Sequence, residues 1–292
     1  MFKKILKWTA LVLGSVVLLL GLFYFYVSVN IGQRIEKKYS FAPEKLEISQ
    51  DKALLAKGAH LTAIKGCKDC HGPDLAGKVM IDDKALGRLV ATNLTKGQGG
   101  LPARYSTTDW VRALRHGVDA NGQALLFMPS HETTLLSAAD MAAIIAYCQS
   151  LAPVHRQLPA SELGPVVKVM TYLDKMPLLS VEKIDHGKPM VTQVDTLEGV
   201  GMGKYLAVSC SGCHGANLQG GDPVAPGFPP VPNITRAGHV GKWSKAQFMQ
   251  TLRTGKTPEG KQLKNENMPW QMTAQYTDKE LASLYHYCLS LQ

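Results

Sequence analysis

Four of the six cysteines lie in two pentapeptides of the same pattern, Cys67-Lys68-Asp69-Cys70-His71 and Cys210-Ser211-Gly212-Cys213-His214. Two cysteines three residues apart lie on one side of a helical turn, where their sulfurs can bond the two vinyl groups of one haem. The histidine that follows can then ligate the haem iron. A thioredoxin-like redox pair or half of a zinc site needs no histidine at that position. We therefore expect two covalently bound haem c groups, held by Cys67, Cys70 and His71 and by Cys210, Cys213 and His214.

A sixth iron ligand is expected from a methionine in each half of the chain. Met128 and Met268 stand 57 and 54 residues after their histidines, and each is followed by proline. A thioether ligand favours ferrous iron and raises the reduction potential. The predicted iron ligands are thus His71 with Met128 and His214 with Met268. The candidates left open are His131 and His116 in the first half, and Met272 and His239 in the second.

The elements that position these residues occur twice. Asn93 and Asn233, Met128 and Met268, and Cys148 and Cys288 each differ by 140 residues, which indicates an internal repeat. Each copy has a helical pattern before its motif, a middle helix, and a last helix. These helices are expected over 51–64 and 197–208, from Ser106 to Gly117 and Ser244 to Gly255, and after the capping pairs Ser137 with Asp140 and Thr277 with Glu280. No strand pattern competes with them.

On these motifs, each copy resembles a class I cytochrome c domain. The whole chain is similar to the membrane-anchored dihaem cytochromes c of bacterial respiratory chains and to the cytochrome subunits of alcohol, gluconate and aldehyde dehydrogenases. The resemblance implies an all-α fold of two tandem domains, with the first and last helix of each crossing. The first copy has Thr92 before Asn93, where the second has Pro232 and the family pattern usually has proline.

The net charge of +9 is concentrated around one apolar stretch. Thr9 to Val29 holds 21 residues without a charge, which as a helix spans about 31 Å, one hydrocarbon core. The aromatic run from Phe23 to Tyr26 suits an interfacial anchor better than a signal-peptide cleavage site. From Phe41 onward the net charge is only +4, evenly mixed, which gives no reason to expect nucleic-acid binding.

The predicted organisation is an anchor (1–32), a tether (33–48), a first cytochrome domain (49–153), a connector (154–196) and a second cytochrome domain (197–292). Because haem is attached outside the cytoplasm, we expect a single-pass protein of the cytoplasmic membrane with both domains on the periplasmic or extracytoplasmic side. The connector is too apolar for a free linker, so a short helix near 166–175 is expected to pack on the domains.

The remaining cysteines, Cys148 and Cys288, are expected to be buried in the two last helices and not bonded to each other. Thiolate ligation of iron would displace the methionines. Three arginines are weighed as partners of haem propionates, with surface solvation the competing interpretation: Arg88, Arg115 and Arg253.

These features predict an electron carrier with no catalytic residues of its own. Its donor would be a quinol-oxidising complex or a periplasmic dehydrogenase, and its acceptor a terminal oxidase or a soluble cytochrome. Within this interpretation, the alternative to a freely diffusing shuttle on a tether is a tightly held subunit of a larger complex. The alternatives are a dihaem enzyme, such as a peroxidase or sulfur-compound oxidoreductase, and a haem-based gas sensor. Both need an iron with an open or labile position.

Overall fold

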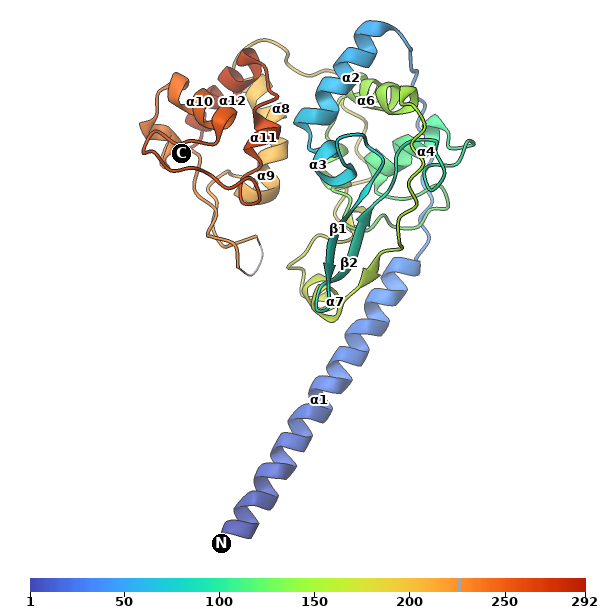
Figure 1. Ribbon diagram of the computed structural model, residues 1–292, viewed down its shortest axis with the longest axis vertical. Helices are drawn as coiled ribbons and strands as arrows, with labels where there is room; N and C mark the ends of the chain where they lie inside the picture. Colours follow the sequence, from blue (N-terminus) through green and yellow to red (C-terminus); the bar gives the residue numbers. More distant parts are fainter. Residues whose placement is uncertain (225–226) are drawn as a thin grey trace.

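The computed structural model spans residues 1–292 and describes all of them except 225 and 226. It is mainly helical, with a long N-terminal helix leading to two lobes (Figure 1). The helices are α1 (Phe2–Glu36), α2 (Lys52–Ile64), α3 (Cys67–His71), α4 (Thr107–Val111), α5 (Ser130–Thr133), α6 (Ala138–Ser150), α7 (Pro165–Tyr172), α8 (Val200–Leu206), α9 (Val208–His214), α10 (Lys245–Thr254), α11 (Trp270–Thr273) and α12 (Asp278–Ser290). Short helical turns cover Arg112–His116, Ser180–Glu182 and Val240–Lys242.

Each repeat is built on the crossing of its first and last helix, α2 with α6 and α8 with α12. The helices approach closely because a glycine stands at each crossing. A Cβ on Gly58 would lie 2.0 Å from the carbonyl oxygen of Ala143, and a Cβ on Gly203 would lie 2.0 Å from that of Ser283. The helix crossing implied by the resemblance is therefore present in both halves.

The middle helices end where the sequence predicted, at glycines that adopt the left-handed conformation, Gly117 (φ 70°) and Gly255 (φ 68°). In the second repeat the middle helix is the regular helix α10. In the first repeat it begins as α4 and finishes as a π-helical turn, Arg112–His116. The insertion of a wider turn is the local difference between the two copies.

A small antiparallel sheet in the first repeat corrects the expectation that no strands would form. Strand β1 (Lys78–Asp83) pairs with β2 (Gly87–Ala91), which pairs in turn with the short β3 (Glu162–Leu163) of the connector. The hairpin carries Val79, Ile81 and Val90, residues that favour strands. The third strand, β3, comes from the connector some 70 residues away, and the local pattern alone did not reveal this pairing.

The long helix α1 has two parts with different surroundings. Its most apolar window has a mean hydropathy of 2.4, and by length and composition it can cross a membrane. Side chains up to Tyr26 are exposed, whereas Val27 and Ile31 are fully buried in the part of the chain where α1 packs against the connector helix α7. The C-terminal third of α1 is thus part of the globular fold, and the helix continues to Glu36, beyond the boundary expected at residue 32.

The segment between α1 and α2 is fixed to the first repeat. The Glu44 carboxylate accepts hydrogen bonds from Arg115 Nε at 2.7 Å and lies 3.0 Å from His116 Nε2. Phe41 stacks on the rings of His116 and His186, with centroids 4.3 and 4.2 Å apart. These contacts hold the first repeat close to the end of α1.

The two repeats share one hydrophobic core. Leu61 and Ile64 of α2 belong to the same buried cluster as Leu206 and Tyr276 of the second repeat. The hydroxyl of Tyr276, a residue only 1% exposed, donates a hydrogen bond across the boundary to the carbonyl oxygen of Ile64 at 3.0 Å. Apolar burial and a buried hydrogen bond therefore fix the relation of the two halves.

Two more contacts cross this boundary reciprocally. The Tyr205 hydroxyl donates to the Asp140 carboxylate at 2.6 Å and accepts from the Ser137 N–H at 3.1 Å. In the other direction, His60 Nε2 lies 2.9 Å from both oxygens of the Glu280 carboxylate. Tyr205 and His60 are equivalent in the repeat, as are Asp140 and Glu280, so the boundary has approximate twofold symmetry.

Candidate haem-attachment sites

The first motif forms the short helix α3, which begins after Gly66 in the left-handed conformation (φ 74°). Cys67 and Cys70 are half-buried, and His71 is buried. Nδ1 of His71 lies 2.7 Å from the carbonyl oxygen of Thr92. Because a carbonyl only accepts, this contact places the ring proton on Nδ1 and leaves the Nε2 lone pair free for a metal. Burial lowers the pKa of His71, against the opposing effect of that hydrogen bond, and so favours the neutral ring.

The second motif repeats this arrangement at the end of α9. His214 is buried, and its Nδ1 lies 2.9 Å from the carbonyl oxygen of Pro232. Burial again lowers the pKa of the histidine, with the hydrogen bond to Pro232 acting against it. Cys210 is half-buried and Cys213 is exposed.

The loops behind the two histidines match in their backbone hydrogen bonds. Gly77 donates its N–H to the carbonyl of His71 at 2.7 Å, and Gly220 does the same to His214 at 2.8 Å. Thr92 takes the place of Pro232 without changing the contact, since in both repeats the backbone carbonyl orients the ring. The departure from the usual proline therefore leaves this part of the loop geometry intact.

The residues present fit a covalently attached haem. Each site offers two thiols on one helical turn and an imidazole that is neutral, oriented and open at Nε2. Among the residues that the structure describes, no cluster of three or more His, Cys, Asp or Glu side chains is arranged to hold a metal ion by itself. A site with this donor set needs a macrocycle to complete the coordination of iron.

The two predicted methionines sit in loops that share a proline and a following helical turn, although Phe127, before Met128, has a positive φ (62°) that Asn267 does not share. Met128 and Met268 are half-buried, and each is followed by a proline that precedes a one-turn helix, α5 or α11. The carbonyl of Met128 accepts from the N–H of Ser130 at 2.8 Å, and that of Met268 from the N–H of Trp270 at 2.6 Å. Ligation of iron by the sulfurs of Met128 and Met268 remains a prediction.

The other ligand candidates are engaged elsewhere or exposed. His116 contacts Glu44 and lies with its Nδ1 2.9 Å from Nδ1 of His186. His131 Nδ1 lies 3.0 Å from the Ser180 hydroxyl. In the second repeat, His239 is exposed. The sulfur of Met272 lies at the boundary between the repeats, 3.5 Å from where a Cβ on Gly66 would be.

Comparison with known proteins agrees with this geometry. The family model for cytochrome c matches two segments of the chain, residues 55–152 and 201–292, which contain both motifs. The chain belongs to the cytochrome c family.

Relatives of this cytochrome c are named as cytochrome subunits of dehydrogenases. The fructose dehydrogenase cytochrome subunit of Gluconobacter japonicus is 26% identical over 73% of this chain and 47% of its own length. The cytochrome c subunit of a quinone-linked alcohol dehydrogenase from Gluconacetobacter polyoxogenes is 24% identical over 82% of this chain and 56% of its own length. The gluconate 2-dehydrogenase cytochrome c subunit of Pantoea cypripedii is 32% identical over 38% of this chain and 26% of its own length. The chain thus spans about half the length of the first two.

The two cysteines outside the motifs are buried, one in each cytochrome c domain. Cys148 in α6 is 4% exposed and Cys288 in α12 is 2% exposed, and neither is in a disulfide. Burial raises the pKa of the Cys288 thiol to about 12 and also raises that of Cys148. Both therefore behave as small apolar core residues.

The three arginines weighed as propionate partners all have partners within the chain. Arg115, which is 3% exposed, binds Glu44 of the tether. Arg253 pairs with Asp278 and donates to the carbonyl of Ala274 at 2.9 Å. Arg88 lies on the hairpin beside the carboxylates of Asp82 and Glu162.

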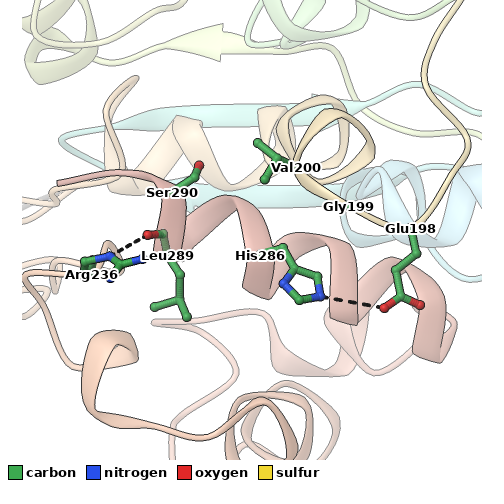
Figure 2. Close-up of a pocket in the computed structure, with 7 residues that line it drawn as sticks. All are labelled: Glu198, Gly199, Val200, Arg236, His286, Leu289 and Ser290. Carbon is green, nitrogen blue, oxygen red and sulfur yellow. Dashed lines mark hydrogen bonds and ion pairs between the residues drawn. The ribbon is translucent and has the colours of Figure 1, made fainter.

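One described cavity lies away from both motifs. It is an open depression of about 570 Å³ between the start of α8 and the end of α12, lined by Glu198, Arg236 and His286 among others (Figure 2). Arg236 Nε donates to the carbonyl of Leu289 at 2.8 Å, which satisfies the end of α12. These side chains serve the local structure, and none of them is a predicted site residue.

The contacts between the domains were not found from the sequence. Asp140 was recognised only as a capping residue for Ser137, but its carboxylate binds Tyr205 and Lys57 instead of completing the cap. The repeat itself could have indicated these contacts, because His60 and Tyr205 are polar residues at matching positions of the two first helices.

Proposed function

We propose that this cytochrome c is a membrane-anchored dihaem electron carrier. It would take single electrons from a dehydrogenase or respiratory donor and pass them to an oxidase or another cytochrome. The observation that carries the proposal is the pair of buried histidines, His71 and His214, each with Nδ1 fixed on a carbonyl beside two cysteines, in two domains packed together. Haem c, when bound, supplies one-electron chemistry at its iron.

The residues proposed to hold the two haems are the thioether cysteines and the axial pairs. Cys67 and Cys70 would attach the first haem, with His71 and Met128 as axial ligands. In the second domain the corresponding residues are Cys210, Cys213, His214 and Met268. The hydrogen bonds on Nδ1 support this assignment because they fix the tautomer and the plane of each imidazole.

Two haems in a fixed relation suit transfer between them. The motif helices α3 and α9 lie on the facing sides of the two lobes (Figure 1), and contacts at this boundary are made on both flanks of the motifs. Ile64, three residues before Cys67, accepts the hydrogen bond from Tyr276. Because the two attachment sites are held rigidly, the distance between the haems would stay constant. The protein would then reorganise little at each electron-transfer step.

The proposed function includes a membrane anchor and a donor protein. Helix α1 would anchor the chain in the cytoplasmic membrane, with Met1 to Trp8 inside and both cytochrome c domains on the extracytoplasmic side, where haem is attached. The names of the relatives support a dehydrogenase as the donor and membership in such a complex. In that role the catalytic residues would belong to the partner subunit.

The test is a haem count followed by a redox titration of the purified full chain. We expect two haems per chain, two one-electron steps, a charge-transfer band that reports sulfur on ferric iron, and no binding of carbon monoxide. One haem per chain would contradict the dihaem assignment. Ready binding of carbon monoxide would contradict a methionine ligand and favour a dihaem enzyme with an open iron position.

A further inference from the structure

The connector helix α7 packs against α1 at the level of its aromatic residues. The ring of Tyr172, the last residue of α7, makes edge contacts with Phe23 and Tyr26 of α1, with ring centroids 6.0 and 5.8 Å apart. Phe23 and Tyr26 belong to the uncharged stretch that ends at Val29. At about 1.5 Å per residue, they lie about 9 and 5 Å inside its outer end. The C-terminal end of α7 therefore lies at the depth where a bilayer passes from headgroups to acyl chains.

One side of α7 is tied to the protein. Val167 is fully buried in an apolar cluster with Leu178 and Leu179, and Thr171, one turn further along, is 3% exposed. The start of α7 is fixed to the tip of the hairpin between β1 and β2, because Val166 donates its N–H to the carbonyl of Ala85 at 3.1 Å. Figure 1 shows α7 and this hairpin at the end of the first domain from which α1 leaves. The helix is thus held in place at that end.

The other side of α7 is apolar and partly exposed. Val166, Val169, Met170 and Leu173, the residue that follows the helix, recur at the spacing of one helix face, and Val169 and Met170 are half-buried. Val166 is 38% exposed and Leu173 is 53% exposed, which is unfavourable in water for side chains of this kind. An exposed apolar face on a short helix, beside the aromatic end of a membrane-crossing helix, is the pattern of an interfacial helix.

We propose that the Val166–Leu173 face of α7 inserts into the outer leaflet of the bilayer and forms a second membrane contact beside α1. The occupant of this face is lipid, because the face continues the lipid-exposed surface of α1 at the same depth. The contact would orient the first domain on the membrane and set the height of its haem. This inference rests on the proposed anchoring by α1.

The experiment uses the full chain with its haems, reconstituted into vesicles of phosphatidylcholine and phosphatidylglycerol. Single cysteines replace Leu173, Val17 in the middle of α1, and Leu197, which is 74% exposed beside the second domain, and each is labelled with the fluorophore NBD. The buried Cys148 and Cys288 do not compete for the label. The haem absorbance of each variant checks that both domains have folded. The readouts are the NBD emission maximum and its quenching by nitroxide-bearing phosphatidylcholine.

The expected result is a blue-shifted, lipid-quenched label at 17 and at 173, and an unshifted, unquenched label at 197. A label at 173 that behaves like the one at 197, while the label at 17 is quenched, overturns the contact of α7 and leaves the anchor intact. That outcome would place the face in water and leave it free for a protein partner. A label at 17 that is not quenched overturns the anchor itself, and α7 with it. The haem count and the redox titration test the proposed dihaem electron carrier separately from all three labels.

Discussion

The hydroxyl of Tyr205 is the group whose removal best tests whether the two domains act as one unit. In Tyr205→Phe the ring stays, including its contact with Lys65, whose ammonium lies 4.9 Å from the ring centroid. Only the oxygen is lost, together with its hydrogen bonds to Asp140 and from Ser137. The packing of the boundary is thus unchanged, and the effect isolates the polar contact.

The cost follows from the burial of the two partners. The Asp140 side chain is 6% exposed and keeps Lys57 as its charged partner. Ser137 is 1% exposed, so water cannot replace the acceptor that its N–H loses. A hydrogen bond to a charged group contributes about 1.5–3 kcal/mol and a neutral one about 1 kcal/mol. We therefore expect Tyr205→Phe to lower the free energy of unfolding by about 2–4 kcal/mol.

The matched control is Tyr285→Phe, which removes one neutral hydrogen bond inside the second domain, from the Tyr285 hydroxyl to the carbonyl of Trp243 at 2.8 Å. It should cost about 1 kcal/mol. Equilibrium unfolding in guanidinium compares the two variants. Hydrogen exchange should rise at the start of α6 and in α8 for Tyr205→Phe, but only around α10 and α12 for Tyr285→Phe. A loss for Tyr205→Phe no larger than that of the control would refute the boundary contact in solution.

Three further predictions concern the ion pair at the boundary, an iron ligand and a helix crossing. The hydrogen bond with Glu280 raises the pKa of His60 above 6.5, so the pair stabilises the protein fully below that pH and is lost as the pH rises through the raised value. The melting temperature should therefore fall over that range by more than in His60→Gln; equal slopes would count against the pair. Met128→Ala should let carbon monoxide bind one of the two haems and lower its potential, with the second haem as internal control; binding at neither would reassign the ligand. Gly58→Ala should cost about 1–3 kcal/mol because its Cβ meets the opposing backbone, while Gly14→Ala, with nothing within 4 Å, should leave stability unchanged in the same unfolding assay.

The sequence predicted the features that depend on neighbours along the chain. The haem motifs, the glycine ends of the middle helices and the cap at Thr277 are set by residues a few positions apart, and the structure has these helix ends and the Thr277 capping box where expected. The repeat extended this to whole domains, because two copies of a weak pattern indicate the same fold twice. The connector helix followed from its apolar composition.

Features that depend on distant partners were missed for a physical reason. The spacing of Ser137 and Asp140 predicted a reciprocal cap, and the Asp140 N–H does donate to the Ser137 hydroxyl at 3.1 Å. The carboxylate, however, goes to Tyr205, 65 residues away in the other domain. Spacing along the chain indicates only local hydrogen-bond partners. That the Asp140 carboxylate accepts from the Tyr205 hydroxyl follows only from the fold, which brings the two residues together. The pairing of β2 with β3 of the connector was missed in the same way.

The reciprocal contacts at the domain boundary can each be changed alone. Equivalent positions face each other in exchange, as they do between two identical subunits related by a twofold axis. In a symmetric dimer of one domain, a single substitution would change both contacts together. In this chain the two contacts differ, because one is made by an ionisable imidazole, His60, and the other by a phenol, Tyr205. A single chain therefore allows the surroundings of His71 and of His214 to be adjusted separately.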